Sequence, residues 1–193
     1  MKKIAILATT ALLALSTSAF AEKFNVDIKK SKVEWIGKKV AGPHNGYVSI
    51  KSGTLETKAK SLSGEFVIDL NTITCEDLKD TTWNAKLVGH LKDADFFDVA
   101  KYPTAQFKIT SAKETSKNNY AIVGQLTIKG ITKEIQFPAV VESSKGKISA
   151  KAAFSIDRTN WNIQYNSGKF FDPKALADKL IDDQIQFNLS LSN

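Results

Sequence analysis

Cysteine and histidine are scarce in this sequence of 193 residues, which contains one cysteine, Cys75, and two histidines, His44 and His90. A single cysteine cannot form an intramolecular disulfide, and the Cys-x-x-Cys spacing of zinc and redox sites is missing. A metal site needs three or four converging ligands, and the spacing of the two histidines does not indicate one. The sequence therefore predicts no cofactor and no metal, and we assign Cys75 no role.

Catalytic motifs are missing as well. The sequence contains no Gly-x-Ser-x-Gly, His-Glu-x-x-His, P-loop or Gly-x-Gly-x-x-Gly pattern. It therefore lacks the local motifs that are typical of serine hydrolases, zinc proteases and nucleotide-binding enzymes. Charge does not favour nucleic acid as a partner either. The formal net charge is +7, but lysines alternate with acidic and polar residues, as in DIKKSKVEW, instead of forming one basic tract.

Long hydrophobic runs are absent except at the N-terminus, which begins MKKIAILATTALLALSTSAFA. Two lysines precede an apolar run that is too short to span a bilayer, and the segment ends in the small-residue pattern of a cleavage site. We predict a signal peptide over residues 1–21, export to the periplasm or the medium, and a mature chain that begins at Glu22. No cysteine follows the cleavage point to carry a lipid anchor. Residues 22–193 have the length of a single domain.

Most of the remaining sequence alternates between apolar and polar residues, with the period of two that is typical of antiparallel strands. The alternating segments include FNVDI, EFVID, AQFKI, YAIVGQLTI, ITKEIQF, KISAKAAFSI and QIQFNLSL. Turn residues such as SKNN, KG and SSKG separate them, and no helical crossover of a parallel sheet intervenes. We count eight or nine strands, which predicts an all-β domain that is either a sandwich or a closed barrel.

Residues 76–98 depart from the strand pattern. Trp83, Leu87 and Leu91 recur at helical spacing, so we predict a short amphipathic helix capped by one of the threonines that precede Trp83. The helix leads directly into Phe96 and Phe97.

The connection from Tyr165 to Asp183 is the other exception. It is long and polar except for a few apolar residues, among them Phe170 and Phe171. Loops of this length are often functional, so we predict that these two rings cover the barrel mouth as a lid. Asp157 and Arg158 lie just before this connection, at the end of a predicted strand. They indicate a structural ion pair or a strand-end clamp rather than an acid–base device.

Four segments together resemble the YceI family of bacterial exported proteins. They are HLKDADFFDVAKYPTAQF, VGQLTIKGITKEIQFP, FSIDRTNWNIQY and DDQIQFNLSLS, and the resemblance extends from FNVDIKKSKVEW to the C-terminus. It implies a lipocalin-like antiparallel barrel of eight strands with one or two short helices. It also implies that the interior holds a long apolar ligand, such as a polyisoprenoid, an isoprenoid quinone or a related lipid.

We therefore predict a carrier rather than an enzyme. The carrier would make transient contact with a membrane or a membrane protein. The inward aromatic residues either line the ligand cavity or simply fill the core, and polar groups at the mouth would contact the ligand head group. The predicted cavity and mouth residues are Trp35, His44, Phe66, Leu87, His90, Leu91, Phe96, Phe97, Phe107, Leu126, Phe137, Phe154, Arg158, Phe170, Phe171 and Phe187.

Two other functions stay open at this point. One is an exported hydrolase or metal-dependent enzyme that uses His44, His90 and the aspartates near His90. The other is a ligand-free stress or interaction protein, for which the barrel interior would be fully packed.

Overall fold

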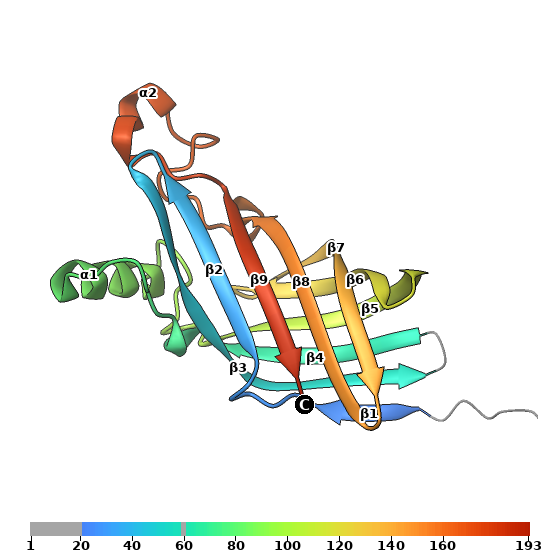
Figure 1. Cartoon of the computed structure of the whole chain (residues 1–193). Helices are drawn as coiled ribbons and strands as arrows, with labels where there is room; N and C mark the ends of the chain where they lie inside the picture. The colour runs from blue at the N-terminus through green and yellow to red at the C-terminus, as the bar shows by residue number, and fades with distance from the viewer. Residues whose placement is uncertain (1–20, 59–60) are drawn as a thin grey trace, which may run out of the picture.

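The structure, a computed structural model, describes residues 21–58 and 61–193 (Figure 1). The predicted signal peptide, residues 1–21, lies outside the described residues apart from Ala21. In the described part, nine strands form one antiparallel sheet. Their bounds are β1 Glu22–Asn25, β2 Lys32–Lys39, β3 Gly42–Lys58, β4 Ser61–Asp69, β5 Thr104–Ser116, β6 Asn119–Ile128, β7 Ile131–Ser144, β8 Lys147–Asp157 and β9 Gln184–Ser192.

The sheet closes on itself into a barrel. Its strand order is β3-β2-β9-β8-β7-β6-β5-β4, and β4 returns to pair with β3. The additional strand β1 pairs with the C-terminal part of β3, whereas β2 pairs with its N-terminal part, so β1 and β2 follow each other along one edge of a long strand. The closed ring of eight strands confirms the barrel and decides against the sandwich that the alternating pattern left open.

Short helices cover one end of the barrel. Helix α1, Thr81–Lys92, connects β4 to β5, and α2, Pro173–Leu176, lies between β8 and β9. Three 3-10 helices complete the set: η1 Leu70–Thr72, η2 Arg158–Trp161 and η3 Ala177–Lys179. The carboxylate of Asp80 accepts a hydrogen bond from Trp83 N and caps α1, so the cap is one residue before the threonine pair that we expected to supply it. No helix in the described ranges is long and apolar enough to cross a membrane.

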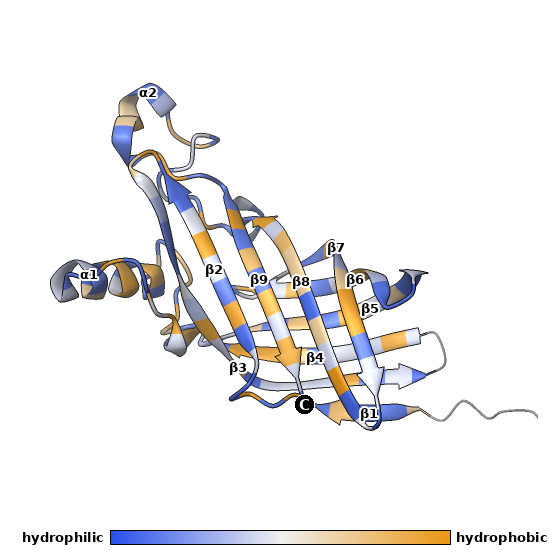
Figure 2. Cartoon of the chain, in the orientation of Figure 1, coloured by the Kyte–Doolittle hydropathy of each residue, from blue (hydrophilic) through white to orange (hydrophobic). Residues whose placement is uncertain are grey.

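Hydrophobic and hydrophilic residues alternate along the strands (Figure 2). Because successive side chains of a strand point to opposite faces, this alternation puts the apolar face of each strand inside the barrel. Tight turns join neighbouring strands at the opposite end from α1. Asn118 and the pair Lys145 and Gly146 have positive φ there, and Lys129 and Gly130 form a similar turn at the α1 end. Such backbone conformations suit the two-residue turns that hairpins favour.

At the end that carries α1, two pairs of neighbouring strands diverge and leave two gaps in the barrel wall. Strand β3 pairs with β4 only from Ser49 onward, and β8 pairs with β7 only up to Ala152. The segment after η1 fills the first gap, where Thr74 N donates to Tyr47 O. Trp161 fills the second gap and donates from Nε1 to Leu126 O at 3.2 Å. We call this end of the barrel the α1 end. Because loops rather than paired strands close it, a cavity can open to solvent there.

Candidate functional site

The barrel interior contains two adjoining cavities. The larger, here called the mouth cavity, has a volume of about 530 Å³ and lies at the α1 end. The smaller, here called the inner cavity, has a volume of about 110 Å³ and lies at the opposite end. Val33, Ile68 and Phe154 line both cavities and form the boundary between them. Sites for small molecules typically measure about 300–1,000 Å³, so the mouth cavity alone has room for a ligand.

The inner cavity is apolar. With the exception of Lys151, its lining residues are aliphatic or aromatic, among them Leu62, Ile122, Val141 and Leu191. Such a space favours hydrocarbon because a polar group placed there would lose its hydrogen bonds with water.

The mouth cavity changes character along its length. Near the boundary its wall is apolar, with residues such as Trp35 and Phe187. At the α1 end the lining includes polar side chains of the β2–β3 hairpin, of α1 and of the connection before β9. These polar residues are Lys38, Lys39, His44, His90, Arg158, Asn166, Asp178, Lys179 and Asp182. The two cavities together therefore suit a molecule with a long apolar body and a polar head.

Three rings from separate segments meet at this mouth. The ring centroids of His90 on α1 and Phe96 in the following turn are 4.9 Å apart, and that of Tyr165 lies 4.6 Å from His90 and 5.6 Å from Phe96. All three residues line the mouth cavity or its rim. His90 Nε2 also lies 3.6 Å from Asp95 Oδ2. The cluster thus joins the α1 region to the long connection beside the cavity.

His44, at the other side of the mouth, belongs to a separate polar group. Its Nδ1 atom lies 2.8 Å from Asp77 Oδ2, while Asn45 N donates to Asp77 Oδ1 at 2.9 Å. Cys75 Sγ donates to the same Oδ1 at 3.3 Å. Burial opposes ionisation of the Asp77 carboxyl, but the hydrogen bonds from Asn45, His44 and Cys75 outweigh it and lower the pKa of Asp77 to about 2.

This group also contains the donor atoms of a conceivable metal site. The ligand atoms of His44, Cys75 and Asp77 lie within 4.8 Å of one another, and no other such group occurs in the part of the chain that the structure describes. An imidazole, a thiol and a carboxylate form a donor set suited to Zn²⁺. Burial, however, raises the pKa of the Cys75 thiol, and the carboxylate already accepts three hydrogen bonds. His90 lies outside the group, so the two histidines do not form one catalytic or metal set.

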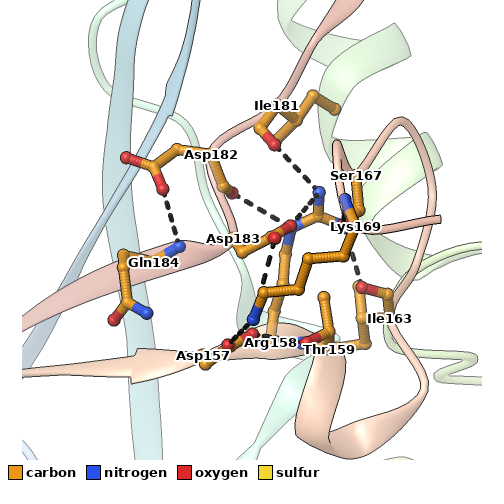
Figure 3. A network of polar contacts seen from close by, with 10 residues as sticks. All are labelled: Asp157, Arg158, Thr159, Ile163, Ser167, Lys169, Ile181, Asp182, Asp183 and Gln184. Atoms are coloured by element: carbon orange, nitrogen blue, oxygen red, sulfur yellow. Dashed lines mark hydrogen bonds and ion pairs between the residues drawn. The ribbon is translucent and has the colours of Figure 1, made fainter. Parts of the chain in front are cut away.

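Arg158 is at the centre of a buried network behind the mouth (Figure 3). Its guanidinium donates to the carbonyl oxygens of Ile163, Ile181 and Asp182 at 2.8, 3.1 and 3.1 Å. Only 1% of the residue is exposed. Burial lowers the pKa of Arg158 and the charge of Asp183 opposes this effect, but an arginine stays charged in either case.

Carboxylates complete this network. Asp183 Oδ1 lies 3.3 Å from Arg158 Nη2, a charge contact in which the oxygen makes no hydrogen bond. Lys169 binds Asp157 and lies 4.0 Å from Asp183 Oδ2. Because the partners of Arg158 lie at both ends of the connection before β9, the network holds that connection against the barrel. Asp157 and Arg158 do not pair with each other: Asp157 pairs with Lys169 and Arg158 with Asp183, and both contacts are structural.

The structure places nearly all predicted site residues around the two cavities. Phe66, Phe107 and Phe137 line the inner cavity, and Phe154 lines both. The predicted residues that line the mouth cavity are Trp35, His44, Leu87, His90, Leu91, Phe96, Phe97, Leu126, Arg158 and Phe187. The structure therefore gathers these side chains into one continuous region, while their contact with a ligand stays a prediction.

Phe170 and Phe171 are the exception, and the lid that we predicted from them needs correction. Neither residue lines the mouth cavity or the inner cavity, and the two residues are 50% and 51% exposed. The reason is a turn in which Phe170 N and Phe171 N both donate to Ser167 O. This turn buries Ser167 and directs the two rings outward, while Tyr165 and Asn166 take the positions at the mouth.

Several lining residues were missed by sequence reasoning. Val33 and Ile68 could have been found, because each belongs to an alternating apolar strand segment. Tyr165 and Ile181 gave no such signal, and neither did Asp77, which contacts the lining residue His44. All three lie in irregular segments, whose path is decided by tertiary contacts.

Comparison with known proteins identifies related chains. The model of the YceI-like domain matches residues 24–192. A UPF0312 protein of Pseudomonas putida is 32% identical over 147 residues, which cover 68% of this chain and 71% of the relative. A UPF0312 protein of Pseudomonas savastanoi is 30% identical over 146 residues, covering 72% and 71% of the two chains.

Solved structures share the barrel. The BcnA protein of Burkholderia cenocepacia superposes with a TM-score of 0.68 at 24% identity, covering 87% of this chain and 99% of the other. A polyisoprenoid binding domain from Saccharophagus degradans gives a TM-score of 0.63 at 12% identity, covering 90% and 98%. At these identities the likeness shows the fold alone.

Proposed function

The chain belongs to the YceI-like domain family, and on that premise we propose that it is an exported carrier that binds one long, mostly hydrocarbon molecule inside its barrel. The ligand class is a polyisoprenoid, an isoprenoid quinone or a related lipid. The observation that carries the proposal is the pair of adjoining cavities, apolar in the interior and bordered by polar groups at the mouth. The name of the Saccharophagus degradans neighbour, a polyisoprenoid binding domain, supports the same ligand class.

The energetics favour retention of such a ligand. A chain of several prenyl units exposes a few hundred Å² of apolar surface, and its burial contributes on the order of 10 kcal/mol at about 25 cal/mol per Å². Ordering the ligand and the protein offsets several kcal/mol of this gain. The remaining free energy is enough for the ligand to accompany the protein through purification.

The polar groups at the mouth take the ligand head group in this proposal. His44 and His90 both line the mouth cavity and can hydrogen-bond a hydroxyl or carbonyl oxygen there. Arg158 contributes less to such binding than we predicted, because its donors already serve three backbone carbonyls. The ligand is held without covalent chemistry, and the separation of the two histidines into different groups supports this view.

Native mass spectrometry of the purified mature protein, before and after solvent extraction, tests the proposal. We expect a mass above that of the polypeptide, its loss on extraction, and rebinding of isoprenoid quinones or fatty-acid derivatives at micromolar concentration. A native mass equal to that of the polypeptide, together with no rebinding, would overturn the carrier function in favour of a ligand-free protein.

A metal-dependent enzyme is the second candidate, because His44, Cys75 and Asp77 converge. It predicts stoichiometric metal after purification and a hydrolytic activity that is lost on chelation. Elemental analysis of the same sample distinguishes it from the carrier, for which neither chelation nor the His44→Ala substitution would abolish lipid retention.

A further inference from the structure

Five phenylalanines form a continuous row of rings inside the barrel. They come from β4, β5, β7, β8 and β9, and their successive centroids lie 6.4, 5.6, 4.3 and 5.6 Å apart. In this order they are Phe66, Phe107, Phe137, Phe154 and Phe187. We call this set the aromatic row. It follows the barrel wall across the strands instead of running along one of them.

The row crosses β6 at a glycine. A Cβ atom built on Gly124 would lie 2.4 Å from Phe107 Cζ and 2.5 Å from Phe107 Cε2, so the Phe107 ring occupies the space in front of this residue. The Phe107 ring therefore approaches Phe137 although β6 separates their strands. The absence of a side chain at Gly124 is what allows the row to continue.

The aromatic row crosses from the inner cavity to the mouth cavity. Phe66, Phe107 and Phe137 line only the inner cavity, and Phe187 lines only the mouth cavity. Phe154 is the one member that lines both, and its ring stacks on Phe137 with an interplanar angle of 13°. Its stacked position therefore puts the Phe154 side chain where any molecule extending from one cavity to the other must pass.

We infer that Phe154 determines the length of hydrocarbon chain that the protein accepts, with the inner cavity as the subsite for the end of the chain. The inference rests on the proposed lipid carrier and specifies its selectivity. The body of the ligand occupies the mouth cavity, and only its end passes Phe154, between Val33 and Ile68, into the inner cavity.

The sizes of the cavities explain why length is limited. The inner cavity, at about 110 Å³, is similar to an engineered cavity of about 150 Å³ that admits benzene. It therefore holds only the last few carbons of a chain. Burying one methylene contributes about 0.8 kcal/mol, and about 1.4 kcal/mol corresponds to a tenfold change in the dissociation constant. Each methylene buried there therefore tightens binding about fourfold. Beyond the length that fills this space, further carbons stay in water at the mouth, so affinity stops rising.

Binding of a graded series of prenyl alcohols, from geraniol upward, to the delipidated protein tests the inference. Phe154→Ala removes the boundary ring, and Ala152→Leu fills the inner cavity from a position that lines only that cavity. Phe97→Ala is the matched control, because it removes the same atoms from a residue that lines only the mouth cavity. Thermal unfolding of each variant shows that it is folded, and Phe154→Leu replaces Phe154→Ala if the latter does not fold.

For the unmodified protein we expect affinity to rise with chain length and then level off. Ala152→Leu should move this limit to shorter chains, Phe154→Ala should move it to longer ones, and Phe97→Ala should weaken binding of all lengths without moving the limit. If the protein binds prenyl alcohols but Phe154→Ala and Ala152→Leu leave the limit in place, the role of Phe154 is refuted and the carrier stands. If no member of the series binds, the carrier and this inference fail together.

Discussion

His44 Nδ1 lies 2.8 Å from Asp77 Oδ2, although the two residues are 33 positions apart in the chain. His44 is in β3, and Asp77 follows η1 in the segment that fills the gap between β3 and β4. The contact therefore closes one side of the barrel at the mouth. With the hydrogen bond from Asn45 N, it adds a side-chain attachment at Asp77 to the backbone hydrogen bonds that Thr74 and Glu76 make with β3.

The Asp77 carboxylate should make stability depend on pH in acid. Its pKa is lowered from 3.8 to about 2 in the folded protein, so the ionised form stabilises the fold fully above about pH 4. This contribution should be lost as the pH falls from about 4 to about 2, because the unfolded chain takes up the proton first.

Asp77→Asn should cost about 1 kcal/mol in the free energy of unfolding at pH 7, since a hydrogen-bonded charge is lost. The difference from the unmodified protein should shrink below pH 4. Urea unfolding at several pH values measures it, with Glu142→Gln on the exposed face of β7 as the control. An Asp77→Asn difference that is independent of pH would contradict this assignment.

Arg158→Met should destabilise the protein strongly. It leaves the buried Oδ1 of Asp183 without the Arg158 charge, and only Lys169 stays nearby, 4.0 Å from Oδ2. Breaking a buried pair in this way costs about 3–5 kcal/mol. Adding Asp183→Asn should recover part of the loss, because the uncompensated charge is then gone. Lys169→Met is the control: its side chain is 53% exposed, so we expect a cost below about 1 kcal/mol. Similar losses for Arg158→Met and Lys169→Met would refute a special role for the buried guanidinium.

Gly124→Ala should cost about 1–3 kcal/mol, because the new methyl group would collide with the Phe107 ring and displace it. Gly89→Ala on α1 is the matched control. A Cβ atom there meets nothing within 4 Å, and alanine favours a helix over glycine by up to about 1 kcal/mol. Guanidinium unfolding of the two variants should give changes of opposite sign. A neutral Gly124→Ala would mean that the Phe107 ring is free to move away.

Replacing both Phe170 and Phe171 by serine should change neither the melting temperature nor the rate of lipid release. Both rings are about half exposed and line no cavity. Tyr165→Ala should speed release, because Tyr165 lines the mouth cavity and contacts His90. Transfer of a bound fluorescent fatty acid to vesicles measures the rates. Faster release from the double serine variant would restore the lid that we expected from the sequence.

If residues 1–21 are removed during export, the mature chain should begin at Glu22. The small residues before this position match the rule for signal peptidase cleavage. N-terminal sequencing of protein from the periplasmic fraction should give Glu-Lys-Phe as the first residues. An intact Met1 in that fraction would rule out cleavage.

The sequence by itself determined the strands and their connections. Alternation of apolar and polar residues predicts a strand wherever one face is buried, and turn residues such as Lys129 and Gly130 predict the hairpins because few residues accept positive φ. The family resemblance supplied the closed barrel, which alternation alone does not distinguish from a sandwich. The strands and hairpins depend on local chemistry, so neighbouring residues are enough to predict them.

Only the tertiary structure decided which side chains meet. The contact of His90 with Tyr165 joins two segments without a shared strand, and the Ser167 turn that faces Phe170 outward depends on how the connection packs. The division of the interior at Phe154 follows from strand register, from the stacking on Phe137 and from the space at Gly124. Alternation with a period of two predicts which residues point inward. The position of each ring along the barrel depends on how all the strands are staggered when the sheet closes.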